Sequence, residues 1–295
     1  MDEYIEKLEA TGDYRITKRL KPTSQYFKDD GTKKRIGIFL DTETTGLNSD
    51  SDKIIELAMV PFEFDSNGRI YRILPEYNEF NDPGILIPEF ITQLTGITDE
   101  MVKGHSINLD KVKNLLTDAE IVIAHNASFD RPFCEDLSAE FENIHWGCSV
   151  KDINWKEEDI SGLKLDYIAY KYGFFFEGHR ATIDCQAGIE ILSRPLLKSG
   201  ELALKRLIDN ALKAKIRLWA LGAPFDKKDV LKQRKYRWNT GESKGHKAWY
   251  IDLPEDEVEN EMTYLRTHVF FRDIRDLPMD RLSSKLRYSN RIRRT

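Results

Sequence analysis

The hydrophobic pattern of the first two-thirds of the chain predicts a buried sheet. Residues 36–40 (IGIFL) form a continuous apolar run that leads into acidic residues, which is typical of a strand covered on both faces. A second apolar run covers residues 53–64, and the Asn67-Gly68 pair predicts a tight hairpin turn after it. Further strands are expected at 69–74 and 121–124.

Helical spacing accompanies these strands. Phe129, Phe133 and Leu137 recur at i, i+4 and i+8, which predicts a helix that begins after Asn126. Further helices are expected from Thr98, where a cap precedes two acids, and at 163–172 and 181–193. This order of elements predicts an α/β fold, with a mixed β-sheet and helices on both faces.

The pattern changes after Pro195. Residues 196–217 are basic and favour a helix. Strands are expected at 217–221 and 247–253, and helices at 226–234 and 254–268. The sequence therefore predicts three parts: an N-terminal extension (1–35) with a short charged helix, an α/β domain (36–195) and a small, basic α+β module (196–295).

Composition favours a globular protein in a reducing compartment. Hydrophobic residues make up 40% of the 295 residues and charged residues 32%. No apolar run approaches the ~18–20 residues of a membrane span, and the first residues are too polar for a secretory signal. Three cysteines without C-x-x-C spacing predict reduced thiols in the core, and hence a cytoplasmic location.

The net charge of −5 hides a division along the chain. Residues 36–193 contain 12 basic and 29 acidic residues, whereas residues 194–295 contain 24 basic and 14 acidic residues. Acidic side chains gather cations, and a basic region attracts phosphates. This asymmetry suits an enzyme that uses metal ions on nucleic acid, although many surfaces are lopsided by chance.

A pair of acidic residues ends the first predicted strand. Asp41 and Glu43 are two residues apart, so their side chains share one face of the strand. Such a D-x-E pair alone is common in surface turns. The residues that follow add two hydroxyl donors, a glycine that allows close approach of a ligand, and an apolar wedge: Thr44, Thr45, Gly46 and Leu47.

Two further segments offer groups of the same kind. His125 and Asn126 follow a predicted strand, and Asp130 lies one turn into the next helix. We place His179 in a loop before the helix that carries Asp184. Singly, each of these residues could be a helix cap or a surface side chain. Together, four carboxylates and one imidazole suit two divalent cations acting on phosphate, with the histidine taking a proton from water.

The three segments resemble the motifs of the DEDDh 3′–5′ exonucleases, the family of the proofreading epsilon subunit of DNA polymerase III. They are FLDTETTGL (39–47), AHNASFDRPF (124–133) and HRATIDCQA (179–187). The stretch QLTGIT (93–98) and the helix at 163–173 also resemble the family, and the resemblance covers about residues 36–197. It implies a ribonuclease-H-like fold and the removal of one nucleotide at a time from a 3′ end.

The resemblance also implies a two-metal mechanism. Asp41, Glu43 and Asp184 would bind one Mg²⁺ or Mn²⁺, and Asp41 and Asp130 would hold the second, directly or through water. His179 would act as general base, and a 5′-mononucleotide would leave. The terminal nucleotide would be bound by Thr44, Thr45, Gly46, Leu47, His125, Asn126 and Phe129.

The basic C-terminal module carries tryptophans near lysines and arginines. Trp219, Trp238 and Trp249 accompany the cluster KQRKYRW (232–238), a combination that can stack bases and follow a phosphate backbone. The same rings could instead form the core of so small a unit. PFDKKDVLKQRKYRW and KAWYI resemble a module appended to some bacterial enzymes of this family. We expect an accessory domain that holds nucleic acid.

Several hypotheses about substrate and partner stay open. The first is a stand-alone exonuclease on single-stranded DNA or DNA 3′ ends, in repair or processing. The second keeps the chemistry but acts on RNA, because contacts to the 2′-hydroxyl cannot be placed from sequence. The third is a polymerase-associated subunit whose tail binds protein. An inactive binding module is disfavoured because all five motif residues are present.

Overall fold

The computed structural model describes residues 2–241, 245–274 and 276–293, and the chain forms two compact units. Unit 1 comprises residues 1–210 and unit 2 residues 211–295. The division falls in helix α8 (Ala203–Leu212), downstream of the residue 195 boundary expected from the sequence. Leu207 explains why α8 begins within unit 1, because its side chain packs closely against Gly147. A Cβ added at Gly147 would lie only 2.7 Å from the Leu207 side chain.

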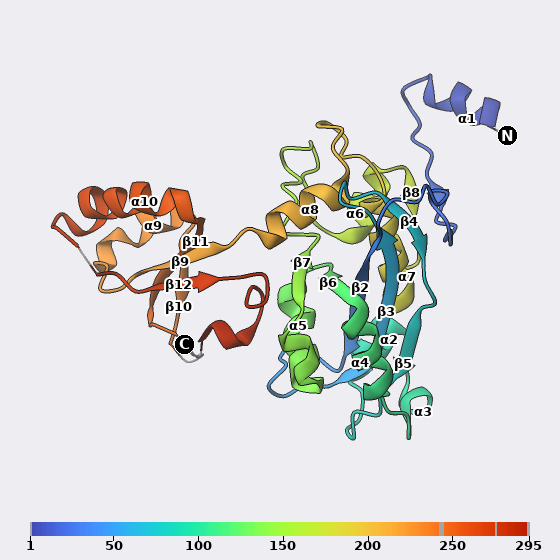
Figure 1. The fold of residues 1–295 in the computed structure, drawn as a ribbon, viewed down its shortest axis with the longest axis horizontal. Helices are drawn as coiled ribbons and strands as arrows, with labels where there is room; N and C mark the ends of the chain where they lie inside the picture. The colour runs from blue at the N-terminus through green and yellow to red at the C-terminus, as the bar shows by residue number, and fades with distance from the viewer. Residues whose placement is uncertain (1, 242–244, 275, 294–295) are drawn as a thin grey trace. The chain divides into compact units, whose positions relative to one another are not determined.

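Unit 1 is built on a six-stranded mixed sheet (Figure 1). Its strands are β2 (Arg35–Thr44), β3 (Ile54–Phe64), β4 (Ile70–Ile73), β5 (Tyr77–Phe80), β6 (Ala119–Ala124) and β7 (His145–Cys148). The order is β4-β3-β2-β6-β7, and β5 also pairs with β3. Strands β2, β6 and β7 are parallel, whereas β3 is antiparallel to β2. The predicted ribonuclease-H-like mixed sheet is confirmed.

Helices pack on both faces of this sheet. Helix α7 (Ala181–Leu192) lies on β2 and β3, and α5 (Ala127–Leu137) contacts β2, β6 and β7. The two helices meet opposite faces of β2, because Phe39 contacts α7 whereas Thr42, an odd number of residues away, is hydrogen-bonded to α5. Helix α6 (Leu165–Lys171) packs beside α7, and α4 (Leu109–Asp118) packs on β6.

The structure contains elements that the sequence analysis did not predict. In unit 1 they include β5, β7, α4, α2 (Glu89–Thr95) and the short strand β8 (Phe174–Phe175), and two short strands of unit 2, at 237–239 and 279–282, were not predicted either. Helix α4 buries only Val112 and Leu116, so its apolar pattern is sparse, and Asn108 caps it by accepting a hydrogen bond from Lys111 N at 3.0 Å. The helix expected after Thr98 is a single turn, α3 (Asp99–Val102), and the Thr98 side chain makes no capping hydrogen bond.

The N-terminal extension is attached to unit 1. Helix α1 (Asp2–Glu9), which the sequence predicted, is followed by β1 (Lys18–Arg19), which pairs in parallel with β8. Further along, the Tyr26 hydroxyl donates a hydrogen bond to Glu190 of α7 at 3.0 Å. The extension therefore contributes contacts to the helix that carries Asp184.

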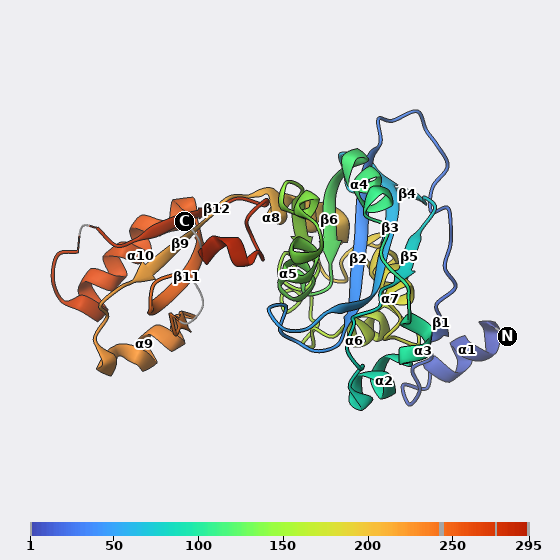
Figure 2. The ribbon, with the colours of Figure 1, turned by 90° about the horizontal axis from the view of Figure 1, so that it is seen from below.

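Unit 2 is a small α+β fold, as the sequence predicted. Its antiparallel sheet has the order β10-β11-β9-β12. The strands are β9 (Lys215–Ala220), β10 (Arg237–Asn239), β11 (Ala248–Pro254) and β12 (Met279–Leu282). Helices α9 (Lys228–Gln233) and α10 (Val258–Tyr264), the latter continued by a π-helical turn (Leu265–Phe270), lie beside these strands (Figure 2). Leu218, Leu231 and Leu265 share one core.

Two further expectations concern membranes and cysteines. Among the described residues, no helix combines the length and apolar character needed to cross a bilayer. Cys134, Cys148 and Cys185 are free and buried, as expected for thiols that serve as small core residues. Burial raises the pKa of each of these thiols above its ordinary value, which keeps them protonated.

Candidate active site

One close contact brings strand β2 and helix α7 together at the site. A Cβ at Gly188 would lie 2.1 Å from the Phe39 ring, so only glycine lets α7 approach β2 this closely. Asp41 and Glu43 share the face of Phe39, and Asp184 lies one helical turn before Gly188. The packing of α7 against β2 thereby carries the carboxylate of Asp184 to the two carboxylates of the strand.

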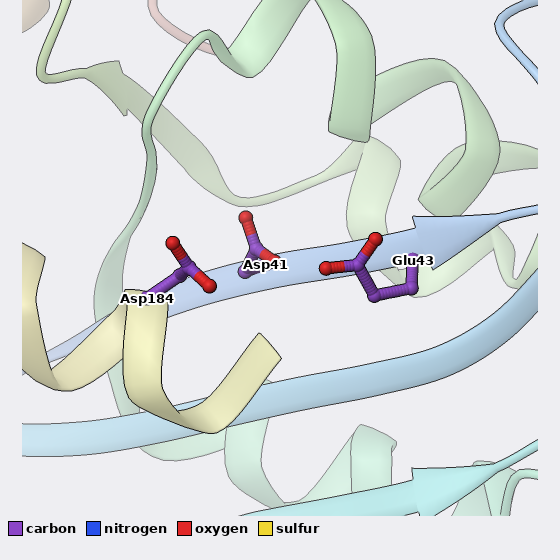
Figure 3. A group of neighbouring side chains, drawn as sticks. All are labelled: Asp41, Glu43 and Asp184. Carbon is purple, nitrogen blue, oxygen red and sulfur yellow. The ribbon is translucent and has the colours of Figure 1, made fainter. Parts of the chain in front are cut away.

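The three carboxylates form a compact cluster. Asp41, Glu43 and Asp184 each offer an oxygen atom that lies within 4.8 Å of the others. Figure 3 shows the two side chains of β2 and the side chain from the start of α7 directed toward a common space. An all-oxygen set of this kind is what hard divalent cations prefer.

Asp130 of α5 is held by the same strand, between the two acids of β2. It is 2% exposed, and its Oδ1 accepts hydrogen bonds from Thr42 N at 3.2 Å and Thr42 Oγ1 at 2.9 Å. Asp130 is outside the group of three, but its charge raises the pKa of Asp41. The sequence motif predicted Asp130 but not Thr42, whose position between the two acids of β2 was the available signal.

The cluster concentrates negative charge in a poorly hydrated place. Burial, followed by repulsion from its acidic neighbours, raises the pKa of Glu43 to about 8 and that of Asp41 well above its ordinary value. Burial likewise raises the pKa of Asp130 to about 7 and that of Asp184 to about 6. These carboxyls compete for protons, which is the electrostatic condition that a bound cation relieves.

His179 lies directly before α7, in the loop position that the sequence predicted. Its side chain is exposed, and its backbone adopts a left-handed φ of 65°. The charge of His179 lowers the pKa of Asp184, which shows that the imidazole is near the cluster. A non-glycine residue in this conformation costs roughly 1–3 kcal/mol and persists only where its surroundings impose it.

Glu56 and Arg180 supply that constraint, and the sequence analysis missed both. Glu56 is fully buried on β3, opposite Glu43 in the register. Its carboxylate accepts hydrogen bonds from Arg180 Nη2 at 3.2 Å and from the backbone N of Ala181 at 3.3 Å, and Asn78 Nδ2 donates another at 3.0 Å. Arg180 N in turn donates to Asp184 Oδ2 at 3.2 Å. Arg180 therefore ties the His179 loop to both β3 and the cluster.

The loop after Glu43 is held by Asp52. Asn48 N donates to Asp52 Oδ2 at 2.8 Å, and Lys53 N donates to Thr45 Oγ1 at 3.0 Å. A Cβ at Gly46 would lie 2.5 Å from Asp52 Oδ2, so a larger residue at this position would displace the Asp52 carboxylate from its hydrogen bond with Asn48. Leu47 is 86% exposed, so the loop presents an apolar side chain to solvent beside the acids.

The second predicted binding segment lies where β6 ends and α5 begins. His125 is neutral near pH 7, because burial lowers its pKa to about 4, and both ring nitrogens have partners, Ser149 Oγ and Leu163 O, each at 2.8 Å. Asn126 is exposed with a left-handed φ of 78° and makes no side-chain capping bond. His125 is thus held by hydrogen bonds at both ring nitrogens, whereas Asn126 faces solvent.

Comparison with known proteins places this geometry in a family. The profile of the exonuclease family (RNase T) matches residues 38–192, more than half of the chain. The PolC-type DNA polymerase III of Caldanaerobacter subterraneus subsp. tengcongensis is 29% identical over 222 residues, which cover 68% of this chain and 15% of that polymerase. The PolC-type enzyme of Clostridium perfringens is 33% identical over 172 residues, 56% of this chain and 11% of the relative. The chain thus spans a small part of these relatives.

Solved structures of nucleases are also similar in part. Exonuclease X bound to 5′-overhanging duplex DNA has a TM-score of 0.42 and 23% identity, covering 59% of this chain and 99% of that chain. Escherichia coli exonuclease I bound to a dA16 oligonucleotide has a TM-score of 0.49 and 14% identity, covering 79% of this chain and 71% of that chain. The profile match over residues 38–192, which include all three acidic segments, decides the assignment: this chain belongs to the DEDDh-type 3′–5′ exonuclease family.

Proposed function

We propose that this chain is a metal-dependent exonuclease that hydrolyses phosphodiester bonds at the 3′ ends of DNA and releases 5′-mononucleotides. The observation that carries the proposal is the cluster of Asp41, Glu43 and Asp184, whose oxygens lie within 4.8 Å of one another in a chain of this family. The cluster supports phosphate chemistry because it would bind divalent cations, which neutralise its negative charge and attract a phosphate.

The residues present fit two divalent cations, Mg²⁺ or Mn²⁺. Asp41, Glu43 and Asp184 would hold one ion, and Asp41 with Asp130 would hold the other. Supporting this division, Thr42 fixes only one oxygen of Asp130, so the other remains for a metal ion or a water molecule. Bound cations would supply charge neutralisation at the phosphate and acidify a water molecule.

His179 would accept the proton of the attacking water. Its exposed side chain beside Asp184 supports this role, because a general base must reach the solvent that supplies the nucleophile. Arg180 would act as a positioning residue, since its bonds to Glu56 and Asp184 fix the backbone next to the imidazole. His125, with both nitrogens occupied, is not suited to proton transfer.

The terminal nucleotide would lie against the two loops beside the cluster. Exposed Leu47 would act as the wedge between terminal bases, and Thr44, Thr45 and Gly46 would shape the loop that presents it. Asn126 would contact the strand from the end of β6. Phe129, whose ring packs on Phe133 at 5.3 Å, would offer an aromatic edge, and His125 would support this wall.

DNA is the preferred substrate in this proposal because the relatives matched are DNA polymerases. Their similarity also motivates a proofreading role in association with a polymerase. Since the chain covers only 15% and 11% of these two relatives, the polymerase partner is a separate question, which co-purification with candidate polymerases would address. A soluble, cytoplasmic enzyme of replication or repair is part of the proposal.

A labelled-substrate assay tests the activity directly. We expect 5′-labelled single-stranded DNA to shorten from its 3′ end in single-nucleotide steps with Mg²⁺ or Mn²⁺, and not with EDTA. Duplex DNA and RNA of the same sequence would report strand and sugar preference. Asp50→Asn, at an exposed carboxylate of the loop after Leu47, is the matched control for changes in the cluster. Absence of cleavage on every strand and metal would contradict the proposal.

A further inference from the structure

Unit 2 exposes two large aromatic side chains that the sequence analysis did not single out. Phe225 is 81% exposed and Phe271 is 66% exposed. By contrast, Trp219 is 2% exposed, and Trp249 packs against the core. The core interpretation is therefore correct for two of the three tryptophans, whereas Trp238 is 46% exposed, less than either phenylalanine.

Adjacent lysines lie over both exposed rings. Lys228 Nζ is 4.9 Å from the centroid of the Phe225 ring, and Lys227 Nζ is 4.5 Å from that of Phe271. Lys227 and Lys228 are consecutive at the start of α9, so both rings lie within the reach of a lysine side chain from this turn. Each ring thus has a cation over one face and is otherwise largely exposed, so the ring can stack a base while the cation contacts a phosphate.

The positive charge continues along α9. Lys232 is exposed and follows Lys228 by four residues, so both side chains lie on one side of the helix. Like charges at this spacing do not stabilise a helix, so the pair has no evident local structural role. The acidic groups nearby are Asp226, which lies 3.9 Å from Lys227, and exposed Asp229 and Asp273.

The charge of the whole unit favours an anionic partner. Residues 211–295 contain 20 basic and 12 acidic residues, which gives +8, and five of the acids are gathered within 255–261. An anionic polymer with exposed flat bases matches both the charge and the rings. In a duplex the base faces are stacked on one another, so only a single strand can offer them to phenylalanine.

We propose that Phe225, Phe271, Lys227, Lys228 and Lys232, here called the Phe–Lys surface, bind single-stranded nucleic acid. The two rings stack bases, and the lysines contact the phosphates between them. The proposal rests on the proposed function only in its class of substrate. Because both units are on one chain, a strand held by the Phe–Lys surface stays at high effective concentration near the exonuclease unit.

Fluorescence anisotropy of the full chain with oligothymidylate of about 20 nucleotides, longer than the ~4–16 that one single-strand-binding fold covers, tests this surface. EDTA prevents hydrolysis during the titration. We expect the double variant Phe225→Ala with Phe271→Ala to raise Kd at least ~10-fold, because both stacking contacts between ring and base are lost. Lys228→Gln with Lys232→Gln should lower the slope of log K against log salt by about 1.4, or ~0.7 for each phosphate contact.

Matched variants keep the test decisive. Tyr14→Ser removes a ring that is 57% exposed in unit 1, and Lys213→Gln with Lys247→Gln removes two exposed charges of unit 2; both should leave Kd and slope near the wild-type values. Circular dichroism checks folding of every variant. Unchanged Kd in the phenylalanine pair, together with unchanged slope in the lysine pair, would overturn the proposal. Hydrolysis of a thymidine trinucleotide, measured separately, fails only if the proposed function is wrong.

Discussion

The two units place their charges in opposite ways. Residues 1–210 contain 25 basic and 38 acidic residues, and unit 1 buries key acids, with Asp130 2% exposed and Glu56 fully buried. Residues 211–295 carry a net charge of +8, and cations such as Lys232 are exposed. The two units share a chain but differ in both the sign and the depth of their charge.

The degree of burial of a charged side chain determines which kind of ion or polymer it is suited to bind. Buried carboxylates repel one another in a medium that screens poorly, so they favour small ions of high charge and compete for protons. Exposed lysines are screened over about 10 Å, so each attracts weakly and only many together hold a polyanion. We therefore expect the chemistry in unit 1 and the retention of a strand in unit 2, and the following changes test that division.

The largest effect is expected from Asp41→Asn. Loss of this shared carboxylate removes charge stabilisation worth several kcal/mol, so kcat should fall by more than about 10³-fold. Single-turnover hydrolysis of a short oligonucleotide measures the change. Asp50→Asn should retain wild-type turnover. If Asp41→Asn were as active as Asp50→Asn, the carboxylate cluster would have no role in hydrolysis.

The next effect concerns His179→Ala. Loss of the general base should lower kcat by about 10²–10⁴-fold while metal binding is retained, because the imidazole is not among the carboxylate ligands. In this variant turnover should therefore fall while the affinity for Mn²⁺ stays near the wild-type value. His105→Ala, at another exposed histidine of unit 1, is the control. Near-normal turnover of His179→Ala would remove the proton-transfer role.

A chain that ends at Lys213, after α8, removes unit 2. Hydrolysis of a trinucleotide should persist, whereas affinity for long single strands should fall at least ~10-fold as the second attachment is lost. The cut lies after α8 because Leu207 belongs to the packing of unit 1 beside Gly147. Equal affinity of the shortened and full chains for long strands would show that unit 2 does not hold nucleic acid.

A smaller effect is expected from Arg180→Met. Losing hydrogen bonds to the charged Glu56 should cost roughly 1.5–3 kcal/mol of stability and release the strained backbone of His179. We expect kcat to fall ~10-fold with little change in KM, and Arg180→Lys to recover part of it. A proportional loss in kcat and in the folded fraction would indicate a purely structural role.

The smallest effect is a pH dependence of stability without metal. Glu43, Asp130 and Asp184 have raised pKa values of about 8, 7 and 6, so their contribution to stability is complete below the unfolded values near ~4 and is lost as pH rises through 6 to 8. Bound Mn²⁺ reverses that loss. The increase in Tm caused by Mn²⁺ should be larger at pH 8 than at pH 5, by ~2–4 °C for each kcal/mol. Equal increases at both pH values would contradict the proton competition.

Sequence patterns predicted the parts of unit 1 whose periodicity is strong. The apolar run before Asp41 and the helical spacing of Phe129 and Phe133 gave β2 and α5, because burial on one or both faces leaves a regular pattern. Helix α4 was missed because only two of its residues are buried. Motif spacing predicted the four acids and His179 as site residues, because the residues of each motif are close together in the sequence.

The remaining features depend on contacts between distant segments. Glu56 lies within an apolar strand and meets Arg180 only after α7 packs on β3, so nothing local marks the pair. Gly188 likewise shows its role only beside Phe39. In unit 2, the exposure of Phe225 and burial of Trp219 follow from which ring the small core accepts, and composition cannot rank them.

Calorimetric titration of Mn²⁺ into the full chain tests the central claim most directly, because that claim is that carboxylates from three separate segments form one metal centre. We expect two ions to bind the wild-type chain and the Asp50→Asn variant, and both to be weakened or lost in Asp41→Asn, since this residue is shared. Unaltered Mn²⁺ binding in Asp41→Asn would contradict the account.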